Sequence, residues 1–318
     1  MIFYRKIFQY DKILDMQMNN KKETLIQNIT YMALMAAINV IFVLLTTFVP
    51  VLFFLIVFVL PLTSVLVTIH CKKIYFPIYA LATIGLCMIC TIWRIDDTVF
   101  YVIPSIISGF AFGFMIEKRV PSYWIILITT LLQIGFTYAS IPLIKLLTGR
   151  NIIEVFAIAF GIGEFQYLDY VTPCFIFFIS LAQEILAFMI IKEEIKKFGI
   201  ELEESKYLPL SLCISLCASV TLAIIFIFIY GPISYLMSLI SIFLGIYALI
   251  YLILENNKII YALLVGTFIL SVFLFAIFYP MVKEPLGLVF INIFFVMEGI
   301  IVLINNYLMK HTNKDTIN

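Results

Sequence analysis

The chain is dominated by long apolar runs that carry few charged residues or none. Cutting the sequence at charges, prolines and glycines leaves ten segments of about 20 residues, the length that an α-helix needs to cross a hydrocarbon core about 30 Å thick. A helix at a water interface would show a polar stripe beside its apolar one, and these runs show no such stripe. We therefore expect an all-α fold, a polytopic transmembrane helical bundle of about ten spans. The predicted spans are residues 29–48, 51–70, 74–93, 99–116, 122–144, 171–191, 207–230, 233–254, 259–279 and 286–307.

The composition excludes a water-soluble fold. Of 318 residues, 64% are hydrophobic and 12% are charged, whereas soluble domains are roughly half apolar and a quarter charged. The net charge is only +1, so we expect no nucleic-acid partner. The first 26 residues are charged throughout and lack the apolar core of a signal peptide, which predicts a cytoplasmic leader that starts at Met1 or Met18.

The distribution of Lys and Arg predicts the orientation, because cytoplasmic loops retain basic residues. With the N-terminus inside, sixteen basic residues fall on the inner side and four on the outer side. This asymmetry predicts a multi-pass protein of the plasma membrane with both termini in the cytoplasm. The four outer residues are Arg94, Lys145, Arg150 and Lys283.

The most charged stretch after the leader separates six predicted spans from four, and we interpret it as a boundary between two bundles. The resulting domains are a leader at residues 1–26, a six-span domain at 27–191, a charged cytoplasmic linker at 192–206, a four-span extension at 207–307 and a cytoplasmic tail at 308–318.

Four polar side chains fall inside predicted spans. Glu184 and Glu298 are the clearest, because a charged group at the centre of a membrane helix costs about 2.5–3.5 kcal/mol on the insertion scale. Each has two readings: a neutral acid that hydrogen-bonds a neighbouring helix, or a group that handles a ligand or a proton. Asn39 and Gln133 are milder cases, for which interhelical hydrogen bonds are the first expectation.

Aromatic and charged residues gather at the predicted outer rim. Aromatic rings with a few convergent polar groups are typical of a small-molecule pocket, and an interfacial aromatic belt with solvated charges gives the same pattern. The candidate substrate-binding residues are Trp93, Arg94, Asp97, Tyr101, Glu164 and Asp169.

Signatures of catalysis are missing from the sequence. It contains no H-E-x-x-H, G-x-x-x-x-G-K or G-x-S-x-G pattern. Cys87-x-x-Cys90 resembles half of a zinc site, and no second pair of Cys or His residues completes it. We therefore expect neither an enzyme, nor a metal, nor another cofactor.

The first two predicted spans resemble a known family. The run Tyr31-Met-Ala-Leu-Met-Ala-Ala-Ile-Asn39, the charge-free outer turn after it and the proline-bearing second span that ends in basic residues resemble the substrate-binding S components of energy-coupling factor (ECF) vitamin transporters. The resemblance covers residues 25 to about 198. With its four further spans, the chain is similar to the longer YybS-like bacterial membrane proteins.

The resemblance implies a six-helix block with both termini inside and a ligand held toward the outside. In S components, an Ala-x-x-x-Ala face on the first helix contacts the transmembrane coupling subunit, and Ala33 and Ala37 match that face. The implied partners are ECF-type coupling and ATPase subunits, a small-molecule ligand and the lipid bilayer. The function expected first is a substrate-binding or transport component; the alternative is a membrane scaffold or regulator that recruits cytosolic partners through residues 192–206.

Overall fold

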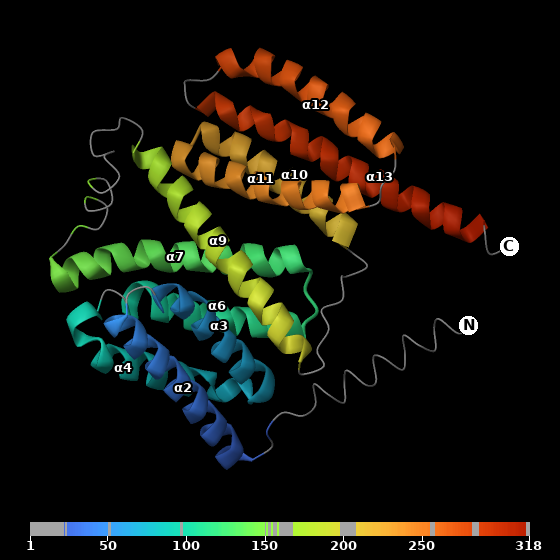
Figure 1. The fold of residues 1–318 in the computed structure, drawn as a ribbon. Coiled ribbons are helices and arrows are strands. Elements are labelled where there is room, and N and C mark those ends of the chain that lie inside the picture. Colours follow the sequence, from blue (N-terminus) through green and yellow to red (C-terminus); the bar gives the residue numbers. More distant parts are fainter. Residues whose placement is uncertain are drawn as a thin grey trace. The chain divides into compact units, whose positions relative to one another are not determined.

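The structure, a computed structural model, describes residues 22, 24–49, 52–95, 98–149, 151, 154, 158, 168–197, 208–254, 258–281 and 286–315, and every regular element within these ranges is a helix (Figure 1). Each predicted span overlaps one long helix. These helices are α2 (Leu25–Phe48), α3 (Phe53–His70), α4 (Phe76–Cys90), α6 (Ile103–Glu117), α7 (Ser122–Thr148), α9 (Leu168–Lys196), α10 (Leu208–Ile227), α11 (Gly231–Leu254), α12 (Lys258–Phe278) and α13 (Ile293–Asp315). Shorter turns of helix join or extend them: η2 (Lys73–Tyr75), η3 (Ile92–Arg94), η4 (Thr98–Val102), η5 (Tyr279–Met281) and η6 (Leu286–Asn292).

Most of these helices have the dimensions of membrane spans. Among the described residues, nine are long and apolar enough to cross a membrane, and Val59–His70 of α3 forms a shorter apolar helix. The prediction of a multi-pass helical bundle is confirmed at this level. The count of ten spans and the inside location of both termini stay predictions.

Local sequence signals explain where the helices begin and end. Thr24 and Gln27 form a capping box at the start of α2. The backbone amide of Gln27 donates to Thr24 Oγ1 at 3.2 Å, and the backbone amide of Thr24 donates to Gln27 Oε1 at 3.4 Å. α7 ends at Gly149, whose φ of 73° is the left-handed conformation that glycine adopts most readily. Its amide donates to the Lys145 carbonyl at 3.0 Å.

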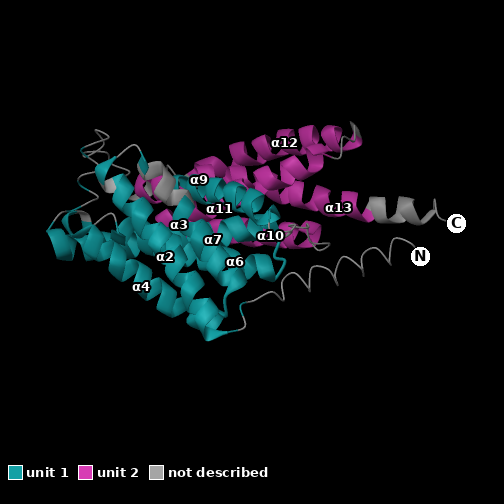
Figure 2. Cartoon of the chain, turned by 60° about the horizontal axis from the view of Figure 1, so that its bottom comes forward, with its two compact units in different colours: residues 1–163, 178–204 teal, residues 164–177, 205–318 magenta. Residues whose placement is uncertain are grey.

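The chain divides into two compact units, coloured separately in Figure 2. Unit 1 comprises residues 1–163 and 178–204 and holds α2, α3, α4, α6, α7 and most of α9. Unit 2 comprises residues 164–177 and 205–318 and holds the first part of α9 together with α10–α13. The domain boundaries given above stay a prediction.

Unit 1 is built around a close contact between α3 and α6. A Cβ atom on Gly109 would lie 2.5 Å from both the Pro61 carbonyl oxygen and Ser64 Cβ, and one on Gly113 would lie 2.7 Å from Thr68 Cβ. Glycine at these two positions lets the helix backbones approach closely, which is how helices associate in lipid, where no hydrophobic force drives them together.

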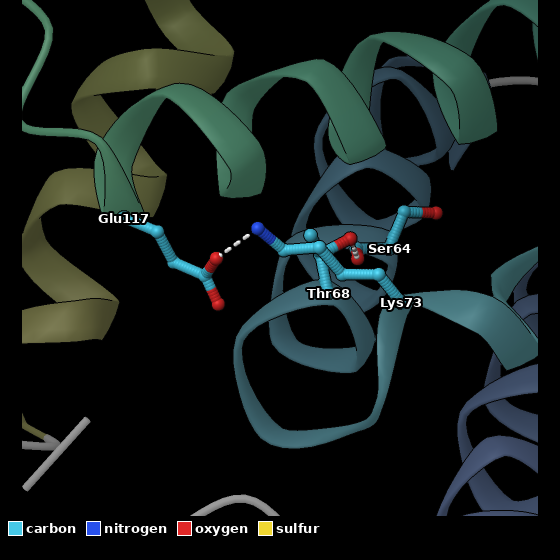
Figure 3. Close-up of polar contacts among 4 residues, drawn as sticks. All are labelled: Ser64, Thr68, Lys73 and Glu117. Carbon is cyan, nitrogen blue, oxygen red and sulfur yellow. Dashed lines mark hydrogen bonds and ion pairs between the residues drawn. The ribbon is translucent and has the colours of Figure 1, made fainter. Parts of the chain in front are cut away.

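Glu117 continues the glycine face of α6, since it follows Gly109 and Gly113 at intervals of four residues. Its carboxylate forms an ion pair with Lys73 Nζ, just beyond the end of α3 (Figure 3). Lys73 Nζ also lies 4.4 Å from the centroid of the Phe114 ring. The partly buried pair thus joins η2 to the end of α6.

Unit 2 pairs α10 and α11 across a short turn and packs α13 against both helices. The Phe295 ring occupies the space that a side chain on Gly245 would fill. Ser241 Oγ on α11 donates to Ser219 Oγ on α10 at 3.0 Å, and Ser234 Oγ donates to the Ala223 carbonyl at 2.6 Å. α12 leaves most of its large apolar side chains exposed, as expected for a helix in contact with lipid.

The contact between α3 and α6 predicts the effect of adding a methyl group to α6. Gly109→Ala should destabilise the protein by about 1–3 kcal/mol, because the new Cβ overlaps backbone and Cβ atoms that cannot rotate away. Thermal unfolding of the purified protein in one detergent measures the change.

Gly135→Ala on α7 is the matched control, because a Cβ there meets nothing within 4 Å and alanine favours helix more than glycine does. Its unfolding temperature should equal or exceed that of the wild type. Equal unfolding temperatures for the two variants would contradict the proposed tight contact.

Candidate functional site

The predicted outer-rim site is described only in part. Asp97 and Glu164 lie outside the described residues, and so do the side chains of Arg94 and Asp169. Trp93 is 94% exposed, and the Tyr101 ring is half-buried, 6.3 Å from the ring of Phe100. A pocket formed by these six residues stays a prediction. Unit 1 holds two clusters of polar side chains that come from three helices each.

The first cluster, the Asn39 cluster, consists of Asn39 on α2, Thr63 and Ser64 on α3 and Tyr79 on α4, all of them buried. Asn39 Nδ2 donates to the Tyr79 hydroxyl at 2.9 Å, and Thr63 Oγ1 donates to Asn39 Oδ1 at 2.7 Å. Ser64 Oγ lies 3.4 Å from the same Tyr79 hydroxyl. Asn39 thus makes hydrogen bonds to two other helices, and the cluster joins three helices through satisfied polar groups.

The partners of Asn39 carry little signal in the sequence. Thr63 and Ser64 are ordinary in membrane helices, because their hydroxyls can bond to the carbonyls of their own helix. Tyr79 offered the clearer signal: its hydroxyl lies within an apolar span and needs a partner when buried.

The second cluster, the Glu184 cluster, consists of Ser108 on α6, Thr129 and Gln133 on α7, and Gln183 and Glu184 on α9. Glu184 is 3% exposed, and the hydroxyls of Thr129 and Ser108 lie close enough to interact with its carboxyl group. Gln133 Nε2 donates to Gln183 Oε1 at 3.4 Å, a long bond between α7 and α9. Gln133 and Glu184, both singled out as polar side chains inside predicted spans, thus belong to one polar cluster that three helices form.

The Glu184 carboxyl group is only partly satisfied. Its Oε2 atom is buried and has no hydrogen-bond partner among the described residues. Thr129 Oγ1 also lies 2.9 Å from the Ile125 carbonyl, and one hydroxyl proton cannot serve both acceptors at once. A buried carboxyl with a vacant acceptor can bind a donor group of a ligand, or a proton.

Metal ligation has little support in the described ranges. Within them, no group of three or more His, Cys, Asp or Glu side chains lies close enough together to hold a metal ion. The Cys87 and Cys90 thiols are free, with Cys87 buried and Cys90 half-buried. Cys87 belongs to the hydrophobic core around α4.

Comparison with known proteins does not extend this description. No family model, no curated protein and no solved structure matches the chain. The class that the helices themselves define is a multi-pass, all-helical membrane protein with buried polar clusters between its spans.

The Asn39 cluster predicts a cost for removing one hydroxyl. Tyr79→Phe should destabilise the protein by about 1–3 kcal/mol, because the Asn39 amide and the Ser64 hydroxyl would lose a partner where no water can replace it. Thermal unfolding in detergent measures the loss. Tyr230→Phe is the control, since Tyr230 is 56% exposed, and it should unfold like the wild type. Wild-type stability of Tyr79→Phe would show that the cluster does not stabilise unit 1.

Proposed function

We propose that this protein is a substrate-binding or transport component for a small solute and that it works with separate energising subunits. The observation that carries the proposal is the Glu184 cluster: a buried carboxyl with an unfilled acceptor atom, surrounded by hydroxyl and amide groups from three helices. A carboxyl group with a purely structural role would have hydrogen-bond partners for both of its oxygens. The polar atoms of the Asn39 cluster have such partners. An intramembrane carboxyl that faces the bundle interior is typical of a substrate or ion pathway.

The exposed face of α2 supports the proposed contact with energising subunits. Ala33 and Ala37 are exposed, while Met32, Met35 and Ala36 of the same helix are buried. The small side chains therefore lie where another helix could approach α2 closely. This arrangement agrees with the coupling-subunit contact that the resemblance to S components implies.

The energy source would lie in other chains. The sequence carries no phosphate-binding G-x-x-x-x-G-K pattern, so ATP hydrolysis would be supplied by ATPase subunits, as in ECF transporters. The resemblance suggests a vitamin-sized ligand for unit 1.

Measuring the unfolding temperature with and without candidate ligands tests whether the protein binds a small solute. Purified protein is heated with individual vitamins, nucleobases and metal ions, and a true ligand should raise the unfolding temperature, since binding to the folded state stabilises it by mass action. Glu184→Gln should weaken binding of that ligand about tenfold or more, because a hydrogen bond to a charged or acidic group contributes about 1.5–3 kcal/mol.

Glu193→Gln on the same helix is the matched control, because Glu193 is exposed and pairs only with Lys196 and its neighbours in sequence. It should bind like the wild type. A panel without any stabilising compound, or a Glu184→Gln variant with wild-type affinity, would contradict the proposal.

The partner prediction is tested by co-purification. Ala33→Phe and Ala37→Phe should remove ECF-type coupling and ATPase subunits from the protein isolated in mild detergent, because a large ring prevents close helix approach. Mass spectrometry of the complex identifies those subunits. Leu45→Phe, also exposed on α2 but about 18 Å along the helix from Ala33, should leave the complex intact. Absence of both subunits from the wild-type preparation would exclude an ECF-type complex.

One observation favours the scaffold alternative. α9 continues to Lys196, beyond the predicted end of its span, and presents local ion pairs of Glu193 with Lys196 at 2.8 Å and Glu194 with Lys197 at 2.6 Å. Exposed pairs of this kind contribute little to stability because solvent screens them, so this charged end could bind a cytosolic partner. If the scaffold function is correct, a protein that lacks residues 198–206 should fail to restore the wild-type phenotype to cells from which the gene has been deleted. If the transport function is correct, it should restore that phenotype.

A further inference from the structure

Unit 2 also holds a buried carboxyl group. Glu298 on α13 is 0% exposed, and neither of its carboxyl oxygens has a hydrogen-bond partner among the described residues. Buried polar groups in proteins are nearly always hydrogen-bonded, and the rare exceptions call for a functional explanation.

The neighbours of Glu298 place it on the packed face of α13. Phe295, one turn earlier, fills the space at Gly245 of α11. A Cβ on Gly299, the next residue, would lie 3.2 Å from Leu216 Cδ1 and 3.4 Å from Cys213 Cα, both on α10. Val302, one turn later, is fully buried. The carboxyl therefore belongs to the interior of unit 2, among α10, α11 and α13.

The described helices of unit 2 place no cationic side chain at this level. α10 and α11 contain no Lys, Arg, His, Asp or Glu at all. Basic residues of α13 begin at Lys310, twelve residues and about 18 Å along the helix, and Lys258 stands at the start of α12. The other titratable groups on the helices packed here are Cys213, Cys217, Tyr235, Tyr247, Tyr251, Tyr261 and Tyr307.

An ionised carboxylate in this position would be very unfavourable. Removing an unpaired charge from water costs several kcal/mol even after the protein relaxes. A positive species must therefore accompany the group. A metal cation needs several oxygen ligands, and the nearest other buried acceptor without a partner on this segment is Asn292 Oδ1, six residues earlier. A proton needs only the carboxyl itself.

We propose that Glu298 is a proton-binding residue of unit 2. The carboxyl holds its proton while α10, α11 and α13 pack as described, and the proton can leave only when water reaches the site. Proton exchange is thereby linked to the packing of α13. This role is independent of the solute site proposed for unit 1.

Infrared spectroscopy of the protein in lipid nanodiscs tests the proposal. At neutral pH the protein should show the carbonyl stretch of a protonated carboxylic acid. The Glu298→Gln variant should lose that band. Glu184→Gln is the matched control, because it removes the other buried intramembrane carboxyl and should leave the Glu298 band in place. The band should shift slowly to lower wavenumber in heavy water, as the proton exchanges for deuterium, and disappear reversibly in alkaline buffer.

Three outcomes overturn the proposal. An unchanged carbonyl region in Glu298→Gln shows that Glu298 is ionised or that the band comes from another group. Loss of the wild-type band on adding sodium chloride at constant pH shows a metal-cation site instead. Where Glu298→Gln fails to fold, Glu184→Gln alone decides: a remaining acid band supports the proton site, and no band excludes it.

Discussion

The structure depends on the lack of water inside a bilayer. Every backbone amide and carbonyl that enters the hydrocarbon core must find its partner within the protein, and a helix satisfies them within one segment. This constraint explains why all the described regular structure is helical and why the helices start and stop at caps, prolines and glycines. It also applies to side chains, because a polar group between these helices has only other side chains or a ligand to bond with.

The buried polar groups differ in how fully they are satisfied. The Asn39 cluster pairs its amide and hydroxyl groups across three helices, which is sufficient for a structural role. The Glu184 carboxyl has the hydroxyls of Thr129 and Ser108 nearby, and its Oε2 atom has no hydrogen-bond partner among the described residues. Glu298 has none for either oxygen within the described part of unit 2. This progression from satisfied to unsatisfied groups separates structural bonds from candidate functional sites.

Small residues determine how closely the helices pack. Gly109 and Gly113 bring α6 against α3, and Gly245 accommodates the Phe295 ring between α11 and α13. In lipid, apolar surface alone provides no net attraction between helices, so such close contacts and the polar clusters beside them supply the association. The ion pair of Lys73 with Glu117 extends the contact between α3 and α6 beyond the apolar region (Figure 3).

The sequence by itself determined the helical class and the approximate position of each helix, because helix length and apolarity are local properties that the bilayer selects directly. It also singled out Asn39, Gln133, Glu184 and Glu298, since each is costly inside a membrane whatever surrounds it. Only the tertiary structure decided which of them are satisfied. The hydroxyl of Tyr79 is 40 residues from Asn39 along the chain, and Thr129 and Ser108 reach Glu184 from other helices. Hydroxyls that bond to their own helix carry no sequence signal of such partners, so helix packing alone brings them together.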